Sequence, residues 1–305
     1  YMSSIIEVRG LTKSFKEITA VDNLTFTVKE KGVYGFLGQN GAGKSTTIRM
    51  LLSLIRPSTG EIKIFGHDLS THRKEILQRT GAIIEKPDLY KYLTAIENMD
   101  LFANMSGLKL KRKQLMDKLE KVGLAERADS KIKTYSQGMK QRLGIAVALV
   151  HDPDLLILDE PMNGLDPQGI ADIRHLINHL SKDLGKTIFI SSHLLSEMEQ
   201  VADSLLIIHK GKKIAEGNMN ELLNPEQSRI ELETSSANEL EGLLKQTSWA
   251  DKIISANGQK IIMQMKREEV PVFIQQLSAM KQDIYSIHKK KFIRRLLFIS
   301  YISLI

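Results

Sequence analysis

The segment that most constrains the fold of this chain is GQNGAGKST, at residues 38–46. It matches the spacing G-x-x-x-x-G-K-[ST] of a phosphate-binding loop. The apolar run at 33–37 precedes it and predicts a buried strand, and the run at 46–52 predicts a helix. The motif therefore stands between the two elements that it requires, which disfavours a glycine-rich turn with a chance lysine. The sequence predicts an α/β fold in which this loop binds phosphate.

Each residue type in this loop suits a phosphate ligand. Glycines let backbone N–H groups turn inward, and the following helix adds the positive end of its dipole. Lys44 is expected to reach the β- and γ-phosphates of a nucleotide, and the Ser45 hydroxyl is expected to ligate Mg²⁺. The residues expected to contact the ligand here are Gly38, Gln39, Asn40, Gly41, Ala42, Gly43, Lys44, Ser45 and Thr46.

Two carboxylates follow a second apolar run. Residues 155–158 predict a buried parallel strand, which ends in Asp159 and Glu160. Ligands of open α/β sheets bind beyond the carboxyl ends of the strands. Asp159 is therefore expected to help hold Mg²⁺, and Glu160 to position and deprotonate an attacking water. Alone, such a pair is as often a strand end exposed to solvent as it is a functional site. The phosphate loop favours the functional interpretation here.

Two single residues are further candidates. Phe15 lies ahead of the phosphate loop, between alternating strands expected at 5–9 and 24–28. Its ring could stack on adenine or be a buried strand residue, and the sequence leaves both open. His193 follows an apolar strand at 187–190. A lone histidine there is usually structural, but this strand comes next after Asp159 and Glu160, so its side chain could face the same crevice.

The remaining elements follow from periodicity and capping. Residues 94–122 are expected to be helical and to form an insertion, and Ser136 is a good N-cap for a helix over 137–150. A helix is expected at 170–184, and short edge strands at 202–208 and 213–216. After residue 225 the order becomes β-α-β-β-α-β, the ferredoxin-like pattern, with no catalytic constellation.

Composition excludes several classes of protein. The chain has no cysteine, which excludes a disulfide framework and a thiolate metal site. No run approaches the roughly 20 apolar residues of a membrane-spanning helix, and residues 1–7 lack a secretory pattern. Five cations within 289–295 account for most of the net charge of +7. The basic character therefore belongs to the tail at 289–305, which suggests either binding to anionic lipid or a disordered or frame-shifted end.

These pieces, in this order, resemble the nucleotide-binding subunit of ABC transporters over about residues 4–222. GQNGAGKST corresponds to the Walker A motif, LLILDE at 155–160 to Walker B, and NGLD at 163–166 to the D-loop. YSQGMKQR at 135–142 stands at the position of the LSGGQ signature, and His193 at that of the switch histidine. Five ordered motifs make the resemblance highly specific.

Two departures point to a subgroup. Gln137 replaces a usual glycine of the signature, and Glu85 stands where most members carry a glutamine that contacts Mg²⁺. Both features, with GAIIEKPDLY at 81–90, are similar to the bacitracin and lantibiotic export or immunity group. Glu85 is thus an expected metal and nucleotide contact, although a carboxylate is not equivalent to an amide.

The resemblance implies a P-loop NTPase core at 4–224, with an antiparallel β subdomain and a helical subdomain at about 86–150. A small α+β ferredoxin-like domain is expected at 225–288. The implied activity is hydrolysis of ATP with Mg²⁺, in which Glu160 is the general base, His193 contacts the γ-phosphate and Phe15 stacks on adenine. Lys44 completes the catalytic set.

The resemblance also implies partners. Two copies would pack head to tail, so that Ser136 and Gly138 of one copy face ATP bound to the other and Asp166 links the two sites. A multi-span permease would complete an exporter, with this subunit in the cytoplasm at the inner face of the membrane. The cargo implied is an antimicrobial or other peptide, and no nucleic acid is expected.

Two alternatives remain open. A non-transport ABC ATPase acting on nucleic acid or ribosomes usually carries two nucleotide domains or a long coiled coil, whereas this chain has one phosphate loop and no long heptad pattern. An exporter of lipid, drug or metal-related cargo is disfavoured only by Glu85.

Overall fold

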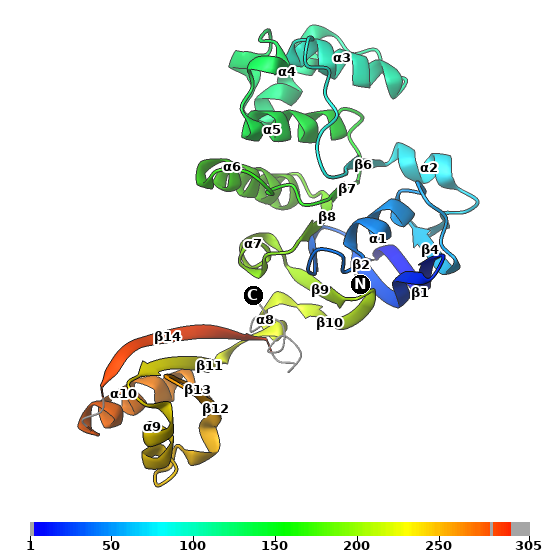
Figure 1. Cartoon of the computed structure of the whole chain (residues 1–305). Coiled ribbons are helices and arrows are strands. Elements are labelled where there is room, and N and C mark those ends of the chain that lie inside the picture. Colours follow the sequence, from blue (N-terminus) through cyan, green and yellow to red (C-terminus); the bar gives the residue numbers. More distant parts are fainter. Residues whose placement is uncertain (1–2, 281–282, 294–305) are drawn as a thin grey trace. The chain divides into compact units, whose positions relative to one another are not determined.

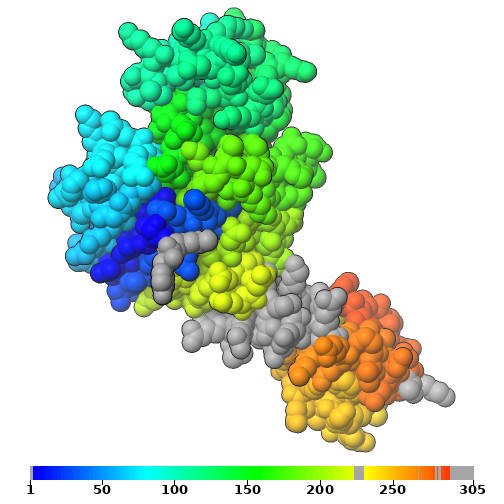
Figure 2. Space-filling view, turned by 180° about the vertical axis from the view of Figure 1, so that it is seen from behind, coloured from blue at the N-terminus to red at the C-terminus, as the bar shows by residue number. Residues whose placement is uncertain are grey.

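The computed structural model describes residues 3–280 and 283–293. The chain divides into two compact units between Gly217 and Asn218, and each unit is described by itself (Figure 1). The first unit contains two sheets and a group of helices. In the space-filling view, the helical segment around residues 95–148 stands out as a lobe of that unit (Figure 2).

The smaller sheet of the first unit is antiparallel, with the strand order β2-β1-β4-β5. Buried and exposed residues alternate along much of its long strands, as the sequence predicted, so one face packs on the core. The strands are β1 (Ser4–Phe15), β2 (Ile18–Lys29), β4 (Thr59–Ile64) and β5 (His67–Asp68).

The larger sheet has the order β10-β9-β3-β8-β7-β6, and β3, β6, β7, β8 and β9 run parallel. Its strands are β3 (Gly32–Leu37), β6 (Thr80–Ile83), β7 (Leu155–Leu158), β8 (Thr187–Ser192), β9 (Ser204–His209) and β10 (Lys212–Asn218). The prediction of two edge strands was wrong for β9, which lies between β3 and β10. Residues 205–208 are apolar on both faces and buried, as an interior strand requires.

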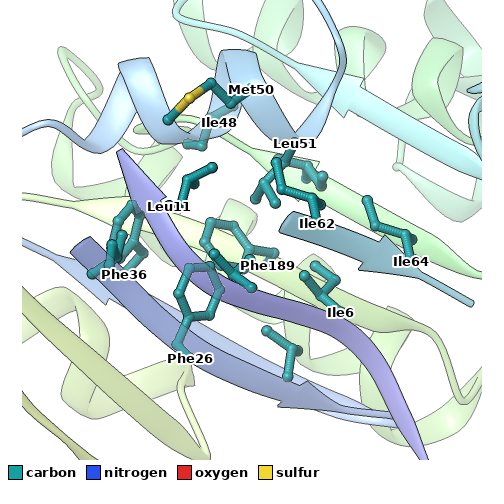
Figure 3. Packing of buried hydrophobic residues seen from close by; sticks show 14 of the residues in the cluster. Ile6, Leu11, Phe26, Phe36, Ile48, Met50, Leu51, Ile62, Ile64 and Phe189 are labelled. Carbon is teal, nitrogen blue, oxygen red and sulfur yellow. The ribbon is translucent and has the colours of Figure 1, made fainter. Parts of the chain in front are cut away.

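The core of this unit fills the space between the two sheets and helix α1 (Lys44–Leu51). Figure 3 shows Phe26 of the smaller sheet and Phe36 and Phe189 of the larger sheet below helix α1, which carries Leu51. The centroids of these three rings lie 5.3–6.1 Å apart. Because β3 and α1 both contribute to this core, the turn that joins them is held at a fixed place.

The helical lobe has the predicted position. It contains α3 (Ala95–Met105), α4 (Arg112–Lys121) and α5 (Gln137–Ala148), with 3₁₀ turns at Ala125–Arg127 and Ile132–Thr134. Elsewhere lie α2 (Arg73–Gln78), α6 (Pro167–Asn178), a π-helical turn at His179–Asp183 and α7 (Leu195–Val201). Helix α6 begins three residues before its predicted start, because Asp166 caps it and Pro167 suits the first helical position. Helix α7 was not predicted.

The second unit confirms the ferredoxin-like pattern. After α8 (Met219–Leu222) come β11 (Leu223–Thr234), α9 (Ala237–Leu244), β12 (Ile253–Asn257), β13 (Lys260–Lys266), α10 (Val270–Ala279) and β14 (Ile284–Ile293). The sheet order is β12-β13-β11-β14, with antiparallel neighbours. Trp249 and Phe273 pack edge to face in its core.

The end of the second unit differs from the expectation of a tail that starts at residue 289. Strand β14 continues to Ile293 because it pairs with β11, so 289–293 belong to the sheet. Residues 294–305, on which the lipid-binding hypothesis also rests, lie outside the described residues.

Candidate functional site

The turn between β3 and α1 needs glycine at two positions. Gly43 has a φ of +104°, and a Cβ there would lie 2.5 Å from the Ala20 carbonyl oxygen. A Cβ on Gly38 would lie 2.8 Å from the Ile208 carbonyl oxygen. The loop backbone therefore passes too close to its neighbours for a side chain, and it forms a cradle of main-chain groups.

Helix α1 starts directly at this cradle. The first N–H groups of a helix have no partner within it and carry the positive end of the dipole. Ser45 and Thr46 occupy the first turn and are half-buried, while Gln39, Asn40 and Gly41 form the exposed tip of the loop. These features suit an anionic phosphate group.

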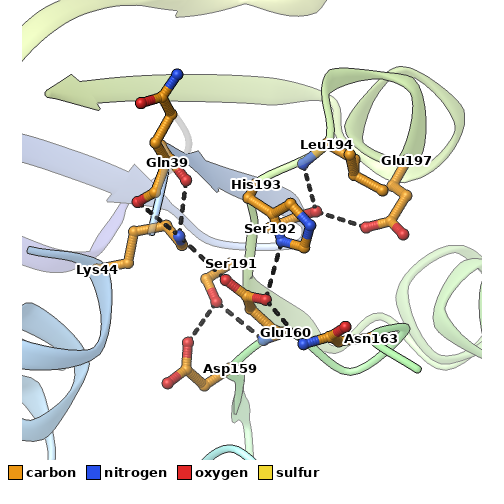
Figure 4. A network of polar contacts seen from close by, with 11 residues as sticks. Gln39, Lys44, Asp159, Glu160, Asn163, Ser191, Ser192, His193, Leu194 and Glu197 are labelled. Carbon is orange, nitrogen blue, oxygen red and sulfur yellow. Dashed lines mark hydrogen bonds and ion pairs between the residues drawn. The ribbon is translucent and has the colours of Figure 1, made fainter. Parts of the chain in front are cut away.

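Lys44 is almost completely buried, with 5% of its surface exposed. Its Nζ donates to the carbonyl oxygens of Gly38, at 2.6 Å, and Gln39, at 3.2 Å. It also lies 3.0 Å from Oε1 of Glu160 (Figure 4). A buried ammonium needs such an anionic partner. A phosphate oxygen of a bound nucleotide is the same kind of partner, so it would compete with Glu160 for Lys44.

Asp159 and Glu160 follow β7 and share a hydrogen-bond partner, Ser191 of β8. The Ser191 hydroxyl donates to Oδ1 of Asp159 at 2.5 Å and accepts from the backbone N–H of Glu160 at 2.9 Å. Oδ2 of Asp159 is buried and has no hydrogen-bond partner among the described residues. A buried carboxylate oxygen left unpaired is costly. A Mg²⁺ ion or its bound water would satisfy Oδ2, so the residues present fit this metal.

Glu160 is held in an unusual backbone conformation. Its φ of +48° is in the left-handed region, which costs a non-glycine residue on the order of 1–3 kcal/mol. The Ser191 hydroxyl and the backbone N–H of Asn163, which donates to the Glu160 carbonyl at 3.1 Å, hold this turn. The strain is compensated by these contacts and aims the carboxylate at Lys44.

The second carboxylate oxygen of Glu160 meets two further side chains. Nδ1 of His193 lies 3.0 Å from Oε2, and Nδ2 of Asn163 donates to the same atom at 3.3 Å. Because a carboxylate can only accept, Nδ1 carries the proton and Nε2 is free to face a ligand. His193 stands at the end of β8, next to β7 in the sheet. His193 therefore lies in the same crevice as Asp159 and Glu160, as the sequence led us to expect.

The structure excludes one of the two alternatives for Phe15, that of a buried strand residue. The residue is 48% exposed at the end of β1, with Nζ of Lys13 4.9 Å from the ring centroid. Phe15 is therefore not a buried strand residue, and its ring is available for stacking.

Glu85 lies outside the network of Figure 4. Its φ is +61°, and its carboxylate forms an ion pair with Arg49 of α1 at 2.8 Å. Among the described contacts it meets Arg49 rather than Ser45 or Asp159.

The remaining predicted residues lie away from the cradle. Ser136 caps α5 by accepting from the backbone N–H of Met139 at 3.2 Å, and Asp166 caps α6 by accepting from that of Gly169 at 2.9 Å. Gly138 is in the first turn of α5, which Figure 1 shows with α3 and α4, apart from α1. The structure brings together Lys44 and the residues after β7 and β8, but not these three.

Sequence reasoning missed two residues of the network, Ser191 and Asn163. Ser191 is fully buried at the end of the apolar strand β8, at the same edge of the sheet as Asp159. A serine at the carboxyl end of a parallel strand was the available signal. Asn163 was noted only as the first residue of the D-loop match at 163–166, and asparagine is common in loops for reasons of local structure alone.

Comparisons with known proteins agree with this geometry. Residues 21–163 match the family model described as "ABC transporter". The chain is 48% identical over 245 residues to the bacitracin transport ATP-binding protein BcrA of Bacillus licheniformis, covering 80% of each chain. It is 41% identical over 226 residues to the lantibiotic transport ATP-binding protein SrtF of Streptococcus pyogenes, covering 72% of this chain and 96% of SrtF.

One relative matches almost the whole chain. The ABC transporter ATP-binding protein YhcH of Bacillus subtilis strain 168 is 40% identical over 287 residues, which cover 94% of this chain and 92% of YhcH. Among solved structures, an ATP-binding subunit of an ABC transporter is 33% identical with a TM-score of 0.64, covering 72% of this chain and 91% of its own. CbiO1 of Clostridium perfringens is 26% identical with a TM-score of 0.67, covering 80% and 96%.

These relatives do not favour an ATPase acting on nucleic acid or ribosomes. Among the helices of residues 3–280 and 283–293, none combines the length and the apolar composition that a membrane span needs. The cradle at Lys44, the free oxygen of Asp159 and the carboxylate of Glu160 suit Mg²⁺-dependent hydrolysis of ATP. The chain belongs to the ABC transporter family, as an ATP-binding subunit that hydrolyses ATP.

Proposed function

We propose that this subunit powers the export of antimicrobial or other peptides across the cytoplasmic membrane, from the inner face and together with a multi-span permease. The observation that carries the proposal is the 48% identity to a bacitracin transport protein over 80% of both chains. The 41% identity to a lantibiotic transport protein supports it, because bacitracin and lantibiotics are both peptides.

In the proposed reaction, the cradle and Lys44 bind the β- and γ-phosphates, and Phe15 stacks on adenine. Asp159, through Oδ2, and Ser45 would hold Mg²⁺, which neutralises the charge that develops on the phosphates. Glu160 accepts the proton of the attacking water after a phosphate oxygen has replaced the Glu160 carboxylate as the partner of Lys44. His193 contacts the γ-phosphate through Nε2, because Nδ1 is fixed on Glu160.

We also propose that two copies complete each other's sites. Gly138 has room for a side chain: a Cβ there would lie 3.6 Å from Cα of Gly169, an ordinary contact. The fold of one chain therefore does not need glycine at 138. A group from outside that approaches the backbone would need it, and ATP bound to a second copy is such a group. Ser136 is exposed beside it, and Asp166 begins α6, where it would link the two sites.

The permease is proposed to dock near the loop that follows β6. Tyr90 and Tyr92 are exposed there, at 54% and 82%. Exposed aromatic rings are typical of partner surfaces. The start of the same loop carries Glu85, whose exposed ion pair with Arg49 is worth at most about 1 kcal/mol. Glu85 is proposed to leave Arg49 for the metal site when nucleotide binds, which would connect permease and ATP.

The test is recovery of the subunit from its native membranes under mild detergent. We expect a multi-span membrane protein to co-purify, and the ATP hydrolysis of that complex in lipid to rise when bacitracin or a lantibiotic is added. The Glu160→Gln variant is the control without hydrolysis. Bound RNA or ribosomal protein in place of a membrane partner would refute transport. Stimulation by lipids or small drugs but not by peptides would refute the cargo.

A further inference from the structure

A second cluster of chemically active side chains lies outside the nucleotide site. It consists of His67 of β5, His72, which precedes α2, and Glu75 in the first turn of α2. Their candidate ligand atoms all lie within 4.8 Å of one another. Nε2 of His67 is 3.5 Å from Oε1 of Glu75, and the two imidazole centroids are 5.0 Å apart.

The chain between β5 and α2 holds these side chains at one place. His67 is fixed by pairing with Ile64 of β4. The carbonyl oxygen of Asp68 accepts from the backbone N–H of His72 at 3.0 Å, which turns the chain back over β5. Ile76 is buried in the core and anchors the first turn of α2. The cluster therefore stands on packed elements and does not depend on a free loop.

His72 is also oriented by a neighbour. Its Nδ1 lies 2.8 Å from the hydroxyl oxygen of Thr71. With Nδ1–H donated to that oxygen, the lone pair of Nε2 is exposed for another partner. Histidines that bind metal commonly have such a contact on the second ring nitrogen, because it fixes the tautomer and the ring plane.

The nature of the donors selects the class of ligand. Two imidazoles and one carboxylate suit Zn²⁺ and similar first-row divalent ions, whereas Mg²⁺ prefers oxygen donors. Tetrahedral Zn²⁺ with bonds of about 2.0–2.1 Å places its ligand atoms about 3.4 Å apart. The separation of His67 and Glu75 already matches this value, and small rotations of these two side chains toward His72 would close the longer separations.

We propose that His67, His72 and Glu75 bind one Zn²⁺ ion or a similar divalent transition ion, with water in the fourth position. Without a metal, the contact between His67 and Glu75 is about half exposed and contributes little to stability. A bound ion would join β5 to the start of α2. Since α2 leads into β6 and then to Glu85, the ion would stiffen the connection that enters the nucleotide site.

The experiment is a Zn²⁺ titration of the full chain against a chromophoric chelator, with Mg²⁺ in excess to occupy the oxygen-rich nucleotide site. We expect the wild type to hold one more tightly bound Zn²⁺ than either His72→Ala or Glu75→Gln. The matched control is His179→Ala, because His179 pairs with Asp183 at 2.7 Å on the surface but has no third ligand in the described part of the chain. It should bind Zn²⁺ as the wild type does. Equal Zn²⁺ binding by the wild type and His72→Ala would overturn the proposal.

Two further readouts test the support of His72 by Thr71 and the spectrum of a bound ion. Thr71→Val should weaken Zn²⁺ binding about 10–100-fold, as loss of a supporting hydrogen bond commonly does, and Thr71→Ser should restore it. Co²⁺ added to the wild type should give visible absorption bands that His67→Ala lacks. ATP binding serves as the check that each variant is folded. Absence of these bands in the wild type, or Thr71→Val with unchanged affinity, would contradict the assignment.

Discussion

Ser191 is a single residue that contacts both acidic residues of the site, Asp159 through its carboxylate and Glu160 through its backbone. Its hydroxyl donates to Asp159 and accepts from the backbone N–H of Glu160, whose backbone is strained. With Oδ1 of Asp159 engaged by this hydroxyl, Oδ2 is the oxygen left for the metal. Ser191 is therefore a positioning residue, which acts through Asp159 and Glu160 and not by contact with ATP.

The Ser191→Ala variant removes both hydrogen bonds and creates no steric conflict. We expect kcat for ATP hydrolysis to fall up to about 100-fold, because a displaced base is inefficient. We expect the Mg²⁺ concentration for half-maximal rate to rise, while KM for ATP changes little. Steady-state kinetics over a range of Mg²⁺ concentrations measures both quantities.

The control for this prediction is the neighbouring buried serine. Ser192 accepts from the backbone N–H of Leu194 at 3.0 Å and bonds to Glu197, so it fixes the entry to α7, and its side chain contacts neither Asp159 nor Glu160. Ser192→Ala should keep the Mg²⁺ dependence of the wild type. If the two variants shifted the Mg²⁺ dependence equally, Ser191 would have no special role in positioning.

Among single residues, the sequence predicts those site residues whose positions follow from a local motif or from the end of an apolar run. Lys44 follows from the loop motif, and Asp159, Glu160 and His193 from the ends of apolar strands. Ser191 could not be assigned, because its role needs β7 and β8 to be neighbours with Leu158 opposite Ile190. That pairing joins segments about 30 residues apart. The left-handed conformation of Glu160 likewise depends on contacts that no local pattern shows.

At the scale of elements, α5 packs tightly against the loop that carries Glu85. A Cβ added to Gly144 of α5 would lie 2.4 Å from Cγ of Pro87. Gly81 of β6 is equally restricted, because a Cβ there would lie 2.2 Å from the carbonyl oxygen of Ala148. The loop after β6 and helix α5, which Ser136 caps, are thus in direct contact. A displacement of that loop would be transmitted to α5.

The segment after α5 makes stability depend on pH. His151 lies with Nε2 3.2 Å from the carbonyl oxygen of Thr80, and its Nδ1 is buried without a hydrogen-bond partner among the described residues. Burial, assisted by the nearby Lys118 ammonium, lowers the pKa of His151. The unfolded chain therefore takes up this proton at higher pH than the folded protein, and stability falls as the pH drops below about 6.5.

Replacement of this imidazole should flatten the pH dependence. In His151→Gln, the amide can still donate to Thr80 but does not titrate. We expect the free energy of unfolding, measured with urea from pH 7 to pH 5, to decline less steeply than in the wild type. Parallel declines would show that His151 does not contribute to acid sensitivity.

Prediction of elements succeeded where periodicity was long and local, as in the alternating β1 and β2 and in the ferredoxin-like order of the second unit. It failed where the three-dimensional context decides. β9 is interior because β10 covers its edge, and α7 is a short helix whose start is set by Ser192 and Glu197. Neither the interior position of β9 nor the start of α7 can be predicted from a short stretch of sequence.

At the scale of the whole molecule, each proposed hydrolysis site is built from two copies of the chain. Gly138→Ala separates this requirement from folding. The substitution meets only ordinary contacts, so the unfolding free energy should stay or rise by about 0.5–1 kcal/mol, as for alanine replacing glycine in a helix. ATP-dependent dimerisation and hydrolysis should nevertheless be lost. Urea unfolding, light scattering and phosphate release measure the three quantities.

The contrasting variant is Gly43→Ala. Its φ of +104° and the 2.5 Å approach to the Ala20 carbonyl oxygen should destabilise the protein as well as abolish ATP binding. Full activity in Gly138→Ala would mean that no second copy approaches α5.

Light scattering on the Glu160→Gln variant, combined with phosphate release, with and without ATP and Mg²⁺, tests most directly whether Glu160 is the base of a site shared by two copies. The amide keeps the shape of the side chain but cannot act as a base, and it frees Lys44 from an ion pair. We predict that ATP still binds, that hydrolysis falls by at least about 100-fold and that the mass doubles from 34.4 kDa. Hydrolysis at the rate of the wild type would contradict the role of Glu160, and a mass that stays at 34.4 kDa with ATP bound would contradict the shared site.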